Sequence, residues 1–103
     1  MRRSPLYSPA AGAQLKSPPV LAWRPVRKAR FYNVQLFRKG RKILTIWPQR
    51  SRLKLHARWT YNGRAQRLRP GVYAWAVWPA FGTQAKPRYG RMIGLSSFRF
   101  VGR

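Results

Sequence analysis

The basic side chains are the groups in this sequence that could do chemistry. The 103 residues include 23 Lys and Arg but no Asp or Glu, so the formal net charge is +23. Each cation must therefore be solvated, stacked on an aromatic ring, hydrogen-bonded to a carbonyl or neutralised by an external anion. Since ordinary protein surfaces mix charges of both signs, this composition favours a protein that binds a polyanion.

The Lys and Arg residues are concentrated in the middle of the chain, between Arg24 and Arg69, and are absent between Pro70 and Ala85. We predict that three groups bind the polyanion, and that two or three of them merge into one surface on the folded domain. The groups are Arg27, Lys28 and Arg30; Arg38, Lys39, Arg41 and Lys42; and Arg50, Arg52 and Lys54.

Aromatic residues lie among these cations, and exposed rings would stack on bases or sugars. The candidates for stacking are Trp59, Tyr61 and Phe31. Trp59 and Tyr61 fit a packed hairpin as well as they fit a contact surface, and the sequence leaves both interpretations open.

The sequence argues against an enzyme. Without Asp, Glu or Cys, carboxylate acid–base pairs, aspartate-oriented triads and thiol nucleophiles are excluded. The one histidine, His56, has no second histidine with which to share a metal. We therefore expect no catalytic residue, no metal, no cofactor and no small-molecule substrate.

The sequence pattern predicts that the segments carrying these cations form short β-strands. Apolar and polar residues alternate within residues 31–37, and Gly40 and the Asn62-Gly63 pair supply turn signals with positive φ. A strand over residues 72–78 is expected to end before Pro79, a polar loop is expected from Gly82 to Arg91, and a last strand is expected over residues 92–101. No helical period is visible, so the pattern predicts an all-β domain with about seven short strands.

The residues Leu68, Pro70, Gly71 and Tyr73 resemble the tyrosine corner of a β-sandwich, in which a buried Tyr hydroxyl bonds to nearby backbone. Pro70 and Gly71 suit the turn, and the phase of the following strand points Tyr73 and Trp75 inward. We predict that the core contains Trp23, Tyr32, Tyr73 and Trp75.

Taken together, residues 18–26, residues 29–36 and the corner at residues 68–73 resemble a fibronectin type III domain, and residues 9–13 resemble the start of bacterial versions. The resemblance covers roughly residues 5–101 and implies an immunoglobulin-like, seven-stranded β-sandwich. The chain departs from the family in its lack of acids and in a longer connection over residues 58–67. It contains no Arg-Gly-Asp tripeptide, so integrin binding is not implied.

We expect residues 1–17 to form a Pro-rich segment partly docked as an edge strand, and residues 18–103 to form the sandwich. The resemblance implies a spacer or binding module whose basic face contacts a cell-wall polymer, lipid headgroups or an acidic protein. The alternative is a cytoplasmic nucleic-acid-binding protein. The start of the chain lacks the apolar segment of a signal peptide, so an extracellular or surface location requires a leader or anchor outside this sequence.

Overall fold

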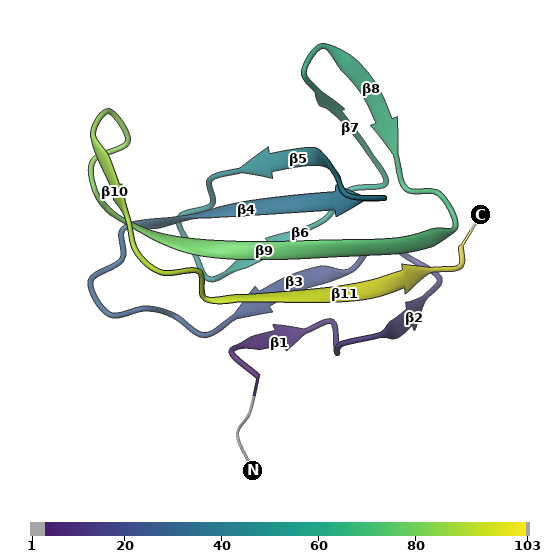
Figure 1. The fold of residues 1–103 in the computed structure, drawn as a ribbon, viewed down its shortest axis with the longest axis horizontal. Helices are drawn as coiled ribbons and strands as arrows, with labels where there is room; N and C mark the ends of the chain where they lie inside the picture. Colours follow the sequence, from purple (N-terminus) through teal and green to yellow (C-terminus); the bar gives the residue numbers. More distant parts are fainter. Residues whose placement is uncertain (1–3, 103) are drawn as a thin grey trace.

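The computed structural model describes residues 4–102, which form β-strands, turns and loops but no helix. Two sheets pack face to face, and a two-stranded hairpin projects from one end (Figure 1). The all-β, sandwich-like prediction is confirmed.

The smaller sheet has the order β1-β3-β6, formed by β1 (Leu6–Ser8), β3 (Val20–Trp23) and β6 (Arg52–Lys54). The larger sheet has the order β2-β11-β9-β4-β5, formed by β2 (Ala13–Leu15), β11 (Gly94–Phe100), β9 (Gly71–Gly82), β4 (Phe31–Arg38) and β5 (Arg41–Ile46). A further strand, β10 (Pro87–Tyr89), pairs with the end of β9, and β7 (Arg58–Tyr61) pairs with β8 (Arg64–Arg67) to form the projecting hairpin. The described residues thus contain eleven strands rather than about seven.

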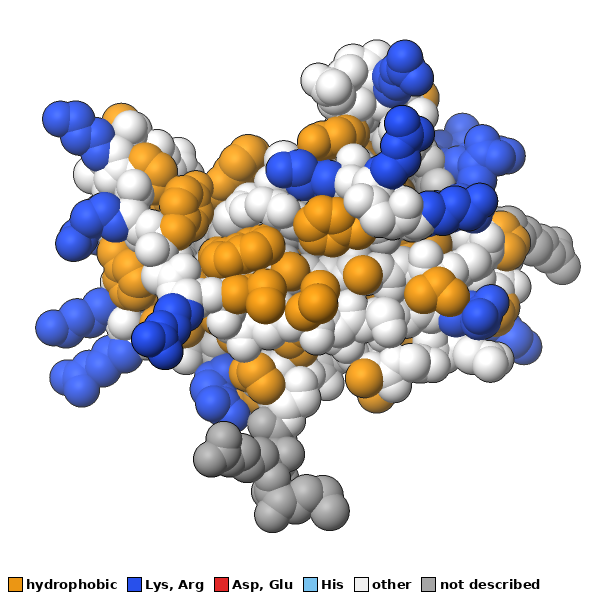
Figure 2. All heavy atoms as spheres, viewed as in Figure 1, with side chains coloured by type: hydrophobic (Ala, Val, Ile, Leu, Met, Phe, Trp, Pro, Cys, Tyr) orange, Lys and Arg blue, Asp and Glu red, His pale blue; other side chains and the backbone are white. Residues whose placement is uncertain are grey.

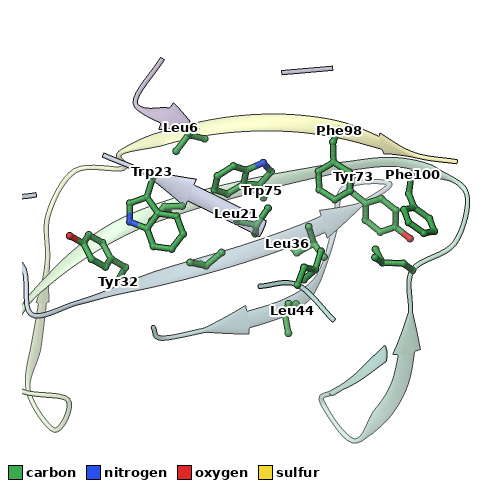
Figure 3. Close-up of a cluster of buried hydrophobic side chains, with 14 residues drawn as sticks. Leu6, Leu21, Trp23, Tyr32, Leu36, Leu44, Tyr73, Trp75, Phe98 and Phe100 are labelled. Carbon is green, nitrogen blue, oxygen red and sulfur yellow. The ribbon is translucent and has the colours of Figure 1, made fainter. Parts of the chain in front are cut away.

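The core lies between the two sheets and follows the period-two pattern of the strands (Figure 3). Trp23 from the smaller sheet packs edge-on against Tyr32 at 5.4 Å between ring centroids, and its ring centroid lies 6.3 Å from that of Trp75. Tyr73 stacks on Phe98 at 5.5 Å. All four predicted core residues are buried, so this prediction is confirmed.

The tyrosine corner is also present. The Tyr73 hydroxyl accepts a hydrogen bond from the Arg69 backbone N–H at 2.8 Å and donates to the Arg69 carbonyl at 3.1 Å. Leu68 is buried beside it, as the sequence pattern predicts. The corner therefore fixes the point where the chain leaves the β7–β8 hairpin and enters β9.

Two tight turns have the left-handed backbone that their residues suggest. At Asn62-Gly63 the φ angles are 54° and 77°, and at Lys39-Gly40 they are 52° and 76°. Two consecutive residues with positive φ match the right-handed twist of the flanking strands. The predictions for Asn62-Gly63 and for Gly40 are confirmed.

The predicted end of the strand at Pro79 is wrong, because β9 continues through Pro79 to Gly82. Proline lacks the N–H that a central strand normally donates. Here β11 pairs with β9 only as far as Val77, and β10 begins to pair at Ala80, so Pro79 falls in the gap between the two partners. The polar loop expected after Gly82 consequently contains a strand, β10.

The first residues of the described chain contribute to both sheets. β1 pairs antiparallel with β3, whereas β2 pairs parallel with β11. Leu6 is buried in the core, while the neighbouring Tyr7 is 54% exposed. The chain therefore crosses from one sheet to the other between residues 8 and 13.

Candidate anion-binding surfaces and aromatic recess

The connections between strands gather at two opposite ends of the sandwich. One end, called here the β10 end, carries residues 24–30, residues 47–51 and residues 83–93. The other end, called the β7–β8 end, carries the turn between β4 and β5, the β7–β8 hairpin and residues 68–70 (Figure 1). Strand β4 runs from the first end to the second, and eight residues of β-strand span roughly 26 Å.

The charged side chains lie on the surface of the described domain. Every Lys and Arg within residues 4–102 is exposed except Arg38, which is half-buried. Figure 2 shows hydrophobic side chains over the middle of one face, with Lys and Arg gathered mainly toward the two ends. On this face, most of the positive charge therefore lies at the two ends.

The three predicted groups do not merge into one surface. Arg27, Lys28, Arg30 and Arg50 belong to the β10 end, whereas Arg38, Lys39, Arg41 and Lys42 belong to the β7–β8 end. Arg52 and Lys54 lie on β6 in the smaller sheet, between the two ends. A merger of all three groups is not found, because β4 separates the first group from the second along its full length, whereas Arg50 of the third group lies at the same end as the first.

Arg38 differs from its neighbours because its side chain is held by the fold. Its guanidinium lies over the Tyr73 ring, 5.4 Å from the centroid, and donates to the Pro70 carbonyl at 3.0 Å. This cation is thus already engaged in the tyrosine corner. The exposed cations at the same turn are Lys39, Arg41 and Lys42.

The β7–β8 hairpin brings further cations to this end. Arg58 and Arg67 are register partners in the hairpin, as Arg38 and Arg41 are across the neighbouring turn. Like charges directly opposite one another destabilise a β-ladder, and this chain has no acid to relieve them. Arg58, Arg67 and Arg69 border a shallow recess of about 260 Å³. The register of the β7–β8 hairpin places Arg58 opposite Arg67. The positions of the cations along the sequence did not indicate this pairing.

The three predicted stacking residues are not free aromatic faces. Phe31 is only 4% exposed, and Tyr89 packs edge-on against it at 6.5 Å, so the expectation of an exposed Phe31 is wrong. Trp59 is half-buried against the core, and its indole N–H donates to the Ile43 carbonyl at 2.7 Å. Tyr61 is half-buried as well. The structure thus favours the packed-hairpin interpretation for Trp59.

Two other aromatic residues are exposed together at the β10 end. Trp47 and Tyr89 are each 48% exposed, and the Trp47 indole N–H donates to the Tyr89 hydroxyl at 3.0 Å. With Phe31 and Gln84 they line a recess of about 330 Å³. The sequence pattern did not indicate this recess, because the residues of β10, which carries Tyr89, have the composition of a polar loop.

The described residues give no sign of a metal or membrane-spanning element. Within residues 4–102, no three side chains of His, Cys, Asp or Glu gather in a way that could hold a metal ion, and His56 is exposed. No helix that could cross a membrane occurs in that range.

No protein-family model, curated protein or solved structure matches this chain.

Proposed function

We propose that this chain is a non-enzymatic binding module with a fibronectin type III-like sandwich, whose basic ends hold an anionic polymer. The fold part of the proposal is supported by the tyrosine corner and by the strand orders β1-β3-β6 and β5-β4-β9-β11. Strands β2, β7, β8 and β10 are additions to that arrangement. The resemblance makes a cell-surface polymer the preferred ligand.

The observation that carries the binding proposal is the set of opposed cations at the β7–β8 end. Arg58 faces Arg67 across the hairpin, and Arg69 borders the same recess. Their mutual repulsion lacks an internal counterion, so an external anion that contacts all three would relieve it. An extended polyanion offers several such charges at once and would release its own counterions on binding.

The proposal is tested by measuring affinity for polyanions across a series of salt concentrations. We expect micromolar or weaker binding that depends little on sequence. For duplex DNA, log affinity should fall against log salt with a slope of about −0.9 per phosphate neutralised. Replacing Arg58, Arg67 and Arg69 together with Gln should make that slope shallower by about two to three.

A matched control removes the same charge from elsewhere. Replacing Lys16, Arg52 and Arg99 with Gln also lowers the net charge by three, but these side chains lie after β2, on β6 and on β11, outside the connections that form the two basic ends. This control variant should change the salt slope clearly less than the variant at Arg58, Arg67 and Arg69 does. Absence of binding to every polyanion at moderate salt would contradict the proposal, and a strong preference for one base sequence would favour the nucleic-acid alternative.

A further inference from the structure

We propose that the recess formed by Trp47, Tyr89, Phe31 and Gln84 binds one sugar residue of an acidic polysaccharide. This inference rests on the proposed function, because it names the class of anionic polymer that the domain holds. The recess, of about 330 Å³, lies near the lower end of the roughly 300–1,000 Å³ of small-ligand pockets. It is therefore large enough for one sugar ring and too small for a folded partner.

The aromatic walls are held in place before any ligand arrives. The Trp47 indole donates to the Tyr89 hydroxyl at 3.0 Å, and the Tyr89 ring packs edge-on against Phe31 at 6.5 Å. Phe31 is itself buried at the start of β4, where it pairs with Ala80 of β9. Fixed walls lower the entropy lost when a ligand binds.

The polar groups of the recess suit a hydroxyl-bearing ring. Since the Tyr89 oxygen accepts the Trp47 N–H, its own hydrogen remains to be donated. The Gln84 carboxamide supplies both donors and an acceptor. A pyranose ring presents apolar C–H faces to aromatic walls and hydroxyl groups at its edge, which matches this division between ring surfaces and polar groups.

Exposed cations occur on the same chain segments that carry the recess residues. Arg30 precedes Phe31, Arg50 lies in the same connection as Trp47, and Lys86 and Arg88 belong to the hairpin that carries Gln84 and Tyr89. All four are exposed. They provide a positive field for a carboxylate on the bound ring and on the neighbouring rings of the polymer.

The arrangement favours a polysaccharide over a single-stranded nucleic acid. Proteins that bind single strands stack successive bases on several exposed aromatic rings along a basic groove. In the described part of this chain, the exposed Trp47 and Tyr89 form one recess, while the exposed Tyr7 lies on β1 in the other sheet. A single ring-sized site fits one sugar of a chain.

The test compares three polyanions of equal charge: an oligogalacturonate of eight residues, poly-glutamate and oligo-dT. Trp47→Ala and Tyr89→Ala remove the walls, and Tyr7→Ala removes a ring of similar exposure from the other sheet. We expect Trp47→Ala to weaken oligogalacturonate binding at least about tenfold and to change poly-glutamate binding by less than about twofold. Tyr7→Ala should change neither.

The tenfold loss should be similar at low and high salt, because the ring contact releases no counterions. Trp47→Phe keeps an aromatic wall and should retain most of the affinity, which guards against a variant that fails to fold. Equal losses for oligogalacturonate and poly-glutamate would overturn the inference, as would a loss confined to oligo-dT. If wild-type protein binds polyanions and Trp47→Ala changes nothing, this inference fails while the proposed function stands.

Discussion

The Tyr73 hydroxyl offers a direct measurement of what the tyrosine corner contributes to stability. Replacing Tyr73 with Phe removes one oxygen and leaves the ring, so the stack on Phe98 at 5.5 Å and the contact with Arg38 at 5.4 Å are retained. Only the two hydrogen bonds with Arg69, at 2.8 and 3.1 Å, are lost. The substitution therefore isolates the hydroxyl from packing.

The magnitude follows from these two bonds. Each hydrogen bond contributes about 0.5–1.5 kcal/mol net, so the pair is worth about 1–3 kcal/mol. Arg69 is exposed, and water can reach part of its backbone in the variant. This relief places the expected loss in the lower half of that range. For a domain of this size, about 1 kcal/mol lowers the melting temperature by roughly 4–8 °C.

The assay is denaturant unfolding of Tyr73→Phe at moderate salt, with the slope m unchanged as evidence that the unfolded state is unaffected. Tyr7→Phe is the control, because Tyr7 is 54% exposed. Tyr32→Phe is an internal comparison, since its hydroxyl accepts one bond, from the Val26 N–H at 3.1 Å. A loss for Tyr73→Phe no larger than that for Tyr7→Phe would refute the reasoning.

Two further predictions concern charge and turns. The melting temperature should rise from low to moderate salt, and more with phosphate or sulfate than with chloride, because the opposed cations lack internal counterions; a melting temperature independent of salt would contradict this. Gly63→Ala should destabilise the β7–β8 hairpin by about 1–2 kcal/mol, because φ is 77° there while no atom lies within 4 Å of the added Cβ. Hydrogen exchange at Trp59–Tyr61 measures this local loss, and unchanged protection would show that the turn does not control the hairpin.

Local patterns were sufficient to predict the tyrosine corner and two of the hairpin turns. The inward phase of Tyr73 and Trp75, and the turns at Gly40 and Asn62-Gly63, each depend on residues that are close in sequence. The continuation of β9 through Pro79 could not be predicted in that way. Whether a proline fits a strand depends on which neighbour faces its missing N–H, and that neighbour comes from residues far along the chain.

The sequence identified the exposed cations of the candidate site, but it did not show which side chains lie together in the folded domain. Every predicted cation is present at the surface except the half-buried Arg38, whose engagement with Tyr73 and Pro70 joins residues more than thirty positions apart. The aromatic recess likewise depends on Trp47 and Tyr89, which are separated by 42 positions. Sequence spacing carries no information about such pairs until the strand order is known.

Because the cations lie mainly at two ends of the sandwich, repulsion within each end matters more than repulsion between the ends. The ends are separated by the length of β4, roughly 26 Å, whereas the Debye length at physiological salt is about 8 Å. Repulsion between the ends is therefore largely screened, while that between Arg58 and Arg67 in adjacent strands is not. Anions should relieve each end separately, so a polymer long enough to span both would gain from the high effective concentration of its second segment. Short anions would stabilise the fold without that gain in affinity. The affinity for a polyanion should therefore increase once the polymer is long enough to span the distance between the two ends.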